Sequence, residues 1–213
     1  LDLCFYVMVS ALVGARLLYV IVEYRYFLND PLEVFKFWKG GLVFYGGLIL
    51  GVLTSLWYLQ RHQMPLWKTA DLLAPSIALG QSIGRWGCLF AGCCYGKKTD
   101  ATWGVTFTDS RSLAPLEVSL HPAQIYLSLN ALFIFIFLMW LSKRKLFDGQ
   151  ILWSYGILYS IGRFLIEYFR GDDRGFPIEQ VFSTSQFVGV FIFILSVFML
   201  LMLYRKKSRI YPS

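Results

Sequence analysis

Charged residues are scarce in this chain. Asp, Glu, Lys and Arg make up 15% of its 213 residues, whereas a soluble globular domain carries about 25%. This shortage argues against an ordinary soluble domain. Hydrophobic residues account for 57% of the sequence, and they gather in segments of about twenty residues, the length that an α-helix needs to cross a bilayer. The composition therefore predicts an all-α, polytopic helical membrane protein.

Histidine is also rare, and the usual catalytic templates of soluble enzymes are absent. The chain has two histidines, no Ser/His/Asp arrangement and no glycine-rich phosphate-binding loop. His62 lies in a link that we expect on the side of the membrane opposite to the candidate site described below. His121 comes at the start of a predicted helix at the outer surface, where it could either titrate near neutral pH or simply begin the helix.

The four cysteines do not form the pattern of a disulfide framework. Cys88, Cys93 and Cys94 are close in sequence, and Cys4 is remote from them. No second cluster of histidine or cysteine accompanies the three, as a structural zinc site would require. We therefore predict no metal site and expect these cysteines to be small packing residues.

The apolar segments predict about six transmembrane helices in one integral membrane domain, residues 1–213. The predicted spans are 3–24, 40–60, 70–90, 121–141, 149–169 and 181–204. Region 91–121, between the third and fourth spans, is the longest segment outside the membrane. Within it, 103–108 is either a short strand or part of a folded loop.

Positive residues set the predicted orientation. The links 61–69 and 143–148 and the tail 205–209 together hold nine Lys/Arg and a single carboxylate. Because positive residues favour the cytoplasmic side, we expect these segments and the C-terminus inside, with 25–40, 91–121 and 170–180 outside. The net charge of +7 is explained by this pattern and by attraction to anionic lipid, so no nucleic-acid partner is predicted.

Three arginines fall inside predicted spans at a similar depth. Arg16, Arg85 and Arg163 lie about 9–12 Å below the outer ends of their helices at a rise of about 1.5 Å per residue. They are either structural, with side chains that reach the interface, or they form a positive site for an anionic ligand. A phospholipid phosphate is the natural ligand of such a site, because guanidinium groups match phosphate geometry.

Two carboxylates accompany these arginines in the spans. Glu167 is four residues from Arg163 and shares a helix face with it and with Tyr159. Asp71 lies near the start of its helix, where we expect it to cap the helix or to interact with its dipole. One carboxylate near three arginines leaves the candidate site positive.

Short motifs run along nearly the whole chain in a fixed order. They are GARL (14–17), GLVFYGG (41–47), Asp71 with Ala74-Pro75, GRWGCLFAGCCYG (84–96), Trp103-Gly104, HPAQIY (121–126) and RFLIEYFR (163–170). In identity and order they resemble the motifs of the prolipoprotein diacylglyceryl transferase family. A single motif of this kind is weak evidence, but the ordered set is strong.

The resemblance implies a multi-pass enzyme of the bacterial cytoplasmic (inner) membrane. The implied reaction transfers diacylglyceryl from phosphatidylglycerol to the lipobox cysteine thiol of a preprolipoprotein, forms a thioether and releases glycerol phosphate, with no cofactor. Membrane lipid is its other expected partner. The family has seven spans, and the six predicted here fit if the first family helix precedes this sequence.

The resemblance also implies site residues in the outer half of the bilayer. Arg85 matches the family's signature arginine, Arg163 matches its second essential arginine, and Tyr45 completes the expected catalytic set. The expected substrate-binding residues are Arg16, Tyr159, Glu167, Arg170, His121, Gln124, Tyr126, Gly46 and Gly96.

The chain departs from the family pattern at five positions. It has Tyr45 where histidine is frequent, Cys88 and Ala91 for asparagines, and Cys93 and Leu127 for glutamates. Tyrosine is a poor general base near neutral pH, so we expect Tyr45 to orient the lipid phosphate or to donate to it. Two alternatives stay open: a paralogue with a different acceptor, and an anion or phospholipid transporter, although no inverted repeat is visible.

Overall fold

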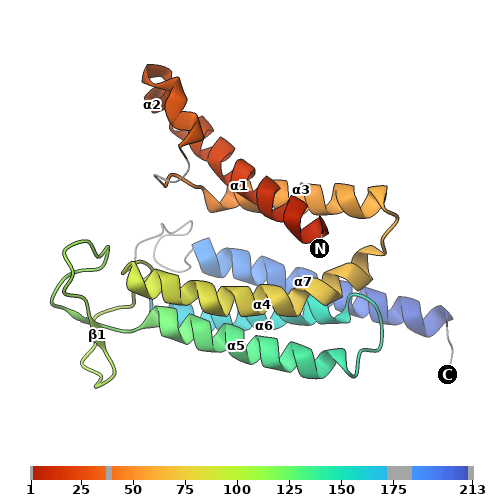
Figure 1. Ribbon diagram of the computed structural model, residues 1–213. Coiled ribbons are helices and arrows are strands. Elements are labelled where there is room, and N and C mark those ends of the chain that lie inside the picture. The colour runs from red at the N-terminus through yellow and green to blue at the C-terminus, as the bar shows by residue number, and fades with distance from the viewer. Residues whose placement is uncertain (1, 37–39, 172–183, 211–213) are drawn as a thin grey trace. The chain divides into compact units, whose positions relative to one another are not determined.

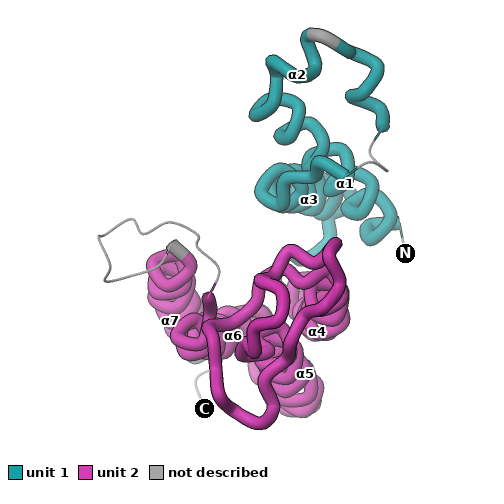
Figure 2. The backbone as a smooth tube through the Cα atoms, turned by 90° about the vertical axis from the view of Figure 1, so that its left-hand side faces the viewer, with its two compact units in different colours: residues 1–66 teal, residues 67–213 magenta. Residues whose placement is uncertain are grey.

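The computed structural model describes residues 2–36, 40–171 and 184–210 (Figure 1). Most of the predicted outer loop 170–180 and the start of the predicted sixth span fall outside these residues. The chain packs as two compact units, Leu1–Leu66 and Trp67–Ser213 (Figure 2). Each unit is described by itself, and the single membrane domain stays a prediction.

The first unit contains a pair of helices that approach each other closely. Its elements are α1 (Asp2–Val22), α2 (Tyr24–Asn29), the 3₁₀ helix η1 (Pro31–Phe35) and α3 (Phe44–Arg61). Helices α1 and α3 meet at Gly14 and Gly46, where a Cβ atom on either residue would collide with the carbonyl oxygen of the other. Small residues allow this close approach of the two helices.

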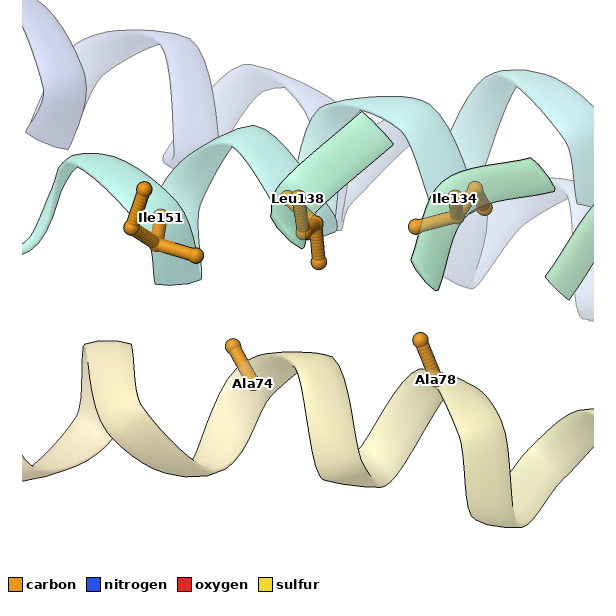
Figure 3. Packing of buried hydrophobic residues seen from close by; sticks show 5 residues of the cluster. All are labelled: Ala74, Ala78, Ile134, Leu138 and Ile151. Carbon is orange, nitrogen blue, oxygen red and sulfur yellow. The ribbon is translucent and has the colours of Figure 1, made fainter. Parts of the chain in front are cut away.

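The second unit is built from four long helices and a small sheet. Its elements are α4 (Leu66–Phe90), β1 (Val105–Thr106), β2 (Ser119–Leu120), α5 (Ala123–Ser142), α6 (Gln150–Glu167) and α7 (Thr184–Ile210). Ala74 and Ala78 of α4 face Ile134 and Leu138 of α5 and Ile151 of α6 (Figure 3). The small alanines let α4 lie close to the branched side chains of its neighbours.

A two-stranded antiparallel sheet organises the connection between α4 and α5. Strands β1 and β2 pair with Val105 opposite Leu120 and Thr106 opposite Ser119. Segment 103–108 therefore includes a short strand within a folded loop, which settles the choice that the sequence left open. The sheet brings the end of the loop back to the start of α5.

The described residues include six long helices, which lie within or around the six predicted spans. By length and composition, three segments of the described chain could cross a membrane, namely Asp2–Val22, Ala123–Ser142 and Ser185–Lys207. The other long helices, α3, α4 and α6, have 18, 25 and 18 residues but carry more glycine and polar residues. Their crossing of the membrane stays a prediction.

Asp71 links two helices that are distant in sequence. Its carboxylate accepts hydrogen bonds from the backbone N–H groups of Gly149 (2.7 Å) and Leu152 (2.9 Å) and lies 2.9 Å from Nζ of Lys145. The predicted structural role is confirmed, but the carboxylate caps the N-terminus of α6 and not that of its own helix. A buried anion is stabilised there because the first N–H groups of a helix lack partners within that helix.

Replacing Asp71 with alanine should destabilise the protein. Two hydrogen bonds to a charged acceptor and the Lys145 contact would be lost, and we expect the free energy of unfolding to fall by about 3 kcal/mol. Asp148→Ala is the matched control, because Asp148 also pairs with Lys145 (2.6 Å) but its side chain is 55% exposed, and such pairs contribute about 0–1 kcal/mol. Denaturation in detergent measures both variants, and equal losses would contradict the capping role.

Candidate active site

Arg163 is buried at the interface of α6 and α7. Its Nη2 atom lies 2.9 Å from Oε2 of Glu167 and donates a hydrogen bond of 2.9 Å to Oγ of Ser185. Arg163 and Glu167 share a helix face, as predicted, and they form an ion pair one helical turn apart. The same carboxylate oxygen lies 3.8 Å from Nε of Arg170, so one negative group serves two buried positive ones.

Arg85 is placed differently, near the end of α4. Its Nη1 atom lies 4.0 Å from Sγ of Cys88 and 3.9 Å from Sγ of Cys94. Among the described residues, no carboxylate lies within ion-pair distance of its guanidinium group. A partly buried arginine without such a partner is suited to an anionic ligand.

A small pocket of about 10 Å³ among α4, α5 and α6 is lined by both arginines. Its lining residues are Gln81, Arg85, Leu127, Asn130, Ala131, Tyr159 and Arg163. The structure therefore brings together Arg85, Arg163 and Tyr159, which the sequence placed in one site. The two guanidinium groups are accompanied there by amide and phenol groups that can donate hydrogen bonds.

Two polar lining residues were missed by the sequence analysis. Gln81 is one helical turn before Arg85 on α4, and Asn130 lies within the apolar helix α5. The signal was present, because polar side chains inside predicted spans are costly and usually face a functional interior. Ser185 was missed as well, since no local pattern connects it with Arg163.

A second group of predicted residues gathers where the loop after α4 meets α5 and α6. The hydroxyl of Tyr126 accepts a hydrogen bond of 2.8 Å from Nε1 of Trp103 and lies 3.2 Å from Nδ1 of His121. The ring of Phe169 contacts both, with centroid distances of 5.3 Å to His121 and 5.8 Å to Tyr126. These rings form a cluster at the start of α5.

Backbone hydrogen bonds tie this loop to both helices. Gly96 N–H donates to the carbonyl of His121 (3.0 Å), and Lys97 N–H donates to the carbonyl of Phe169 (2.8 Å). A Cβ atom at position 96 would collide with the His121 backbone, which gives Gly96 a structural reason for its identity. The ties also hold the chain at Arg170, whose side chain is buried near Glu167.

Gln124 lies at the first turn of α5 and is 1% exposed. Its Nε2 atom donates a hydrogen bond of 2.8 Å to the carbonyl of Cys93. Its Oε1 atom makes no hydrogen bond to the described residues. Gln124 therefore fixes the backbone of Cys93 beside the end of α4.

The three clustered cysteines come together around this point. The Sγ atoms of Cys88, Cys93 and Cys94 all lie within 4.8 Å of one another, and none is in a disulfide. Burial, and after it the neighbouring Cys94 and Cys88, raises the pKa of the Cys93 thiol to about 12. Without a bound metal ion, this raised pKa favours the neutral thiol of Cys93 at neutral pH and disfavours it as a nucleophile.

Arg16 is one of three predicted site residues that belong to the first unit, together with Tyr45 and Gly46. Arg16 donates hydrogen bonds to the carbonyls of Val34 (2.9 Å), Gly40 (2.8 Å) and Gly41 (3.2 Å), and also contacts that of Glu33. This gives Arg16 a structural role that holds the loop after α2, and its contact with a substrate stays a prediction.

Tyr45 and Gly46 begin α3 in the same unit. Tyr45 is 63% exposed, whereas Gly46 is buried in the contact with Gly14 described above. The catalytic role of Tyr45 and the substrate-binding role of Gly46 stay predictions. The geometry of the arginine pocket is defined by the second unit alone.

These features define a class of protein: a multi-pass helical membrane protein with a pocket among its helices that two arginines line. The chain belongs to the prolipoprotein diacylglyceryl transferase family, whose family model matches residues 1–202. It is similar to a protein named phosphatidylglycerol--prolipoprotein diacylglyceryl transferase from Clostridium tetani, with 39% identity over 190 residues that cover 89% of this chain and 75% of the relative.

Other relatives show the same extent of similarity. The protein named phosphatidylglycerol--prolipoprotein diacylglyceryl transferase 2 from Clostridium perfringens is 39% identical over 186 residues, which cover 87% of this chain and 72% of the relative. The transferase of Finegoldia magna is 37% identical over 198 residues, covering 92% of this chain and 75% of the relative.

Proposed function

We propose that this chain transfers a diacylglyceryl group from phosphatidylglycerol to the lipobox cysteine thiol of a preprolipoprotein. Family membership and the names of the relatives support the transferase activity and its two substrates. The single structural observation that carries the proposal is the pocket in which Arg85 and Arg163, from different helices, face the same space.

The chemistry explains why two arginines are needed. The thiol sulfur attacks the carbon of the diacylglyceryl group that bears the phosphate, and a C–S bond forms. The bond between this carbon and the phosphate oxygen breaks, and its electrons pass to that oxygen. The products are a thioether, glycerol phosphate and the proton of the thiol. Phosphatidylglycerol carries one negative charge on its phosphate, and a second develops as the C–O bond breaks. Preorganised guanidinium groups in a pocket with little water stabilise this growing charge.

The two arginines divide this task in our proposal. Arg163 is held by Glu167 and Ser185, so it supplies a fixed positive charge at the pocket wall. Arg85 lies near thiols and near no carboxylate of the described chain, so its guanidinium group is available to the phosphate as a bidentate donor. The pocket amides of Gln81 and Asn130 add hydrogen bonds to the head group.

A transfer assay tests the function directly. Purified protein in phosphatidylglycerol vesicles should add one diacylglyceryl group to a lipobox peptide, measured by mass spectrometry, and should leave a peptide with serine in place of cysteine unmodified. A protein that binds or moves the lipid without producing a thioether would be a transporter. Thioether formation only on peptides that lack a lipobox would indicate a paralogue with another acceptor.

The proposed topology has six spans and a site in the outer half of the bacterial inner membrane. It adds α3, α4 and α6 to the three apolar helices found by length and composition. Single cysteines introduced into 97–118 of a variant that lacks native cysteines should react with an impermeant maleimide from outside, and cysteines in 205–209 should not. Outside labelling of the tail would reverse the orientation and place the arginines in the inner half.

Tyr45 is proposed to position the lipid and not to act as a base. Tyr45→Phe should then cost the equivalent of one hydrogen bond, about 1–2 kcal/mol or ten- to thirtyfold in turnover, at a level that is constant between pH 6.5 and 9. Tyr24→Phe is the matched control, since Tyr24 is also exposed in the first unit. A loss above about a hundredfold at low pH that disappears near pH 9, where a thiol ionises unaided, would make Tyr45 the base.

A further inference from the structure

The end of α4 places three thiols around one point. Cys88 lies in the last turn of the helix, and the chain then reverses through Gly92 (φ 67°) so that Cys93 N–H donates to the carbonyl of Cys88 (3.1 Å). Cys94 has a φ of 61°, a left-handed conformation that is costly for a residue with a side chain. With Cys94 in this conformation, all three Sγ atoms lie within 4.8 Å of one another.

The spacing of the three sulfurs suits a thiophilic metal ion. With Zn–S bonds of about 2.3 Å, the sulfurs of a tetrahedral site are about 3.8 Å apart, so the cluster needs to contract by at most about 1 Å. Soft thiolate ligands select zinc and similar ions. The sequence shows no second pair of ligands, which a closed structural zinc site requires, but a site with three protein ligands and one open position needs none.

The side chains of Arg85 and Gln124 contact the cluster and would support a bound ion. Three thiolates and a divalent ion carry a net charge of −1, and Nη1 of Arg85 lies 3.9–4.0 Å from two of the sulfurs. The Gln124 side chain holds the Cys93 carbonyl at 2.8 Å, which limits movement of this ligand. A fixed ligand and a compensating charge are what outer-shell groups provide at metal sites.

We propose that Cys88, Cys93 and Cys94 bind a divalent thiophilic cation of the zinc type whose open position takes the acceptor cysteine as a thiolate. This inference rests on the proposed function, and it supplies what that function lacks, a means of ionising the acceptor. On coordination the acceptor thiol loses its proton to water. The metal-bound sulfur then forms the C–S bond while the electrons of the C–O bond pass to the phosphate, so the oxidation state of the metal is unchanged.

Cobalt provides a test of binding that does not depend on activity. The protein, kept reduced by a phosphine, should bind one Co²⁺ per chain with the visible absorption of a tetrahedral thiolate site. Cys93→Ser and Cys88→Ser should each lose this absorption. Cys4→Ser should keep it, because Cys4 belongs to α1 of the first unit and is not one of the three clustered thiols. No absorption in the wild-type protein, or the same absorption in Cys93→Ser, would overturn the site.

The role of the ion is tested by two further measurements. Addition of a lipobox peptide should change the Co²⁺ spectrum, and a peptide with serine in place of cysteine should not. Turnover should fall by about a hundredfold or more after chelation and return with Zn²⁺. Full turnover in protein shown to be free of metal would overturn the inference and leave the proposed function intact. Co²⁺ binding that responds to the peptide, without any thioether product, would overturn the proposed function instead.

Discussion

Arg85→Lys should reduce turnover by about 10²–10³-fold, equivalent to about 3–4 kcal/mol, a typical cost of removing one preorganised donor to a developing charge. Lysine keeps the positive charge but loses the planar fork that can hold two phosphate oxygens. The guanidinium group has no carboxylate partner among the described residues, so this change breaks no ion pair seen in the structure. The protein should therefore remain folded and inserted.

Arg111→Lys is the matched control for this experiment. Arg111 belongs to the same unit, in the loop after α4, and its side chain is 88% exposed beside Asp109. Its replacement should leave turnover unchanged. Thermal unfolding in detergent separates a loss of activity from a loss of folding, and near-normal turnover of a folded Arg85→Lys protein would remove the phosphate-binding role.

Glu167→Gln should give the second large effect, on stability as well as turnover. The Glu167 carboxylate lies between Arg163 (2.9 Å) and Arg170 (3.8 Å), and its side chain is 9% exposed. Removing one member of a buried charge group costs about 3–5 kcal/mol. We expect a loss of this size in the free energy of unfolding, because two buried guanidinium groups then lose the carboxylate that lies between them.

The stability of Glu167→Gln should depend on the charge of the surrounding lipid. A phosphate bound in the pocket would replace part of the missing negative charge, so anionic phosphatidylglycerol should restore more stability to Glu167→Gln than to the wild-type protein. A neutral lipid should not. The exposed Glu117→Gln change in the same unit is the control. A destabilisation equal in both lipids would show that the pocket does not hold the phosphate near Arg163.

Local features of this chain were predictable from its sequence. The apolar segments predicted the long helices to within a few residues, and the spacing of Arg163 and Glu167 predicted their ion pair. The sequence predicted a shared depth for Arg16, Arg85 and Arg163; of these, Arg85 and Arg163 line one pocket of the second unit, and Arg16 belongs to the first unit. These successes depend on helix geometry alone, which sets the distance along an axis and the face on which a residue lies.

The features that the sequence could not supply depend on contacts between distant segments. No periodicity indicates that Asp71 caps α6, or that Arg16 binds the carbonyls of the loop after α2. The cysteine cluster was missed for a related reason. The left-handed turn that gathers its three sulfurs is a backbone conformation, and neither hydropathy nor residue spacing reveals it.

The cap that Asp71 provides for α6 sets the heights of Arg85 and Arg163 along their two helices. The Asp71–Gly149 hydrogen bond fixes one point of α4 against one point of α6. Arg85 and Arg163 each follow their fixed point by fourteen residues, which is about 21 Å along a helix. The backbones of Arg85 and Arg163 therefore lie at the same height along the two helices. An insertion of one helical turn in either helix, between the cap and the arginine, would offset them by about 5.4 Å, more than the width of a phosphate group.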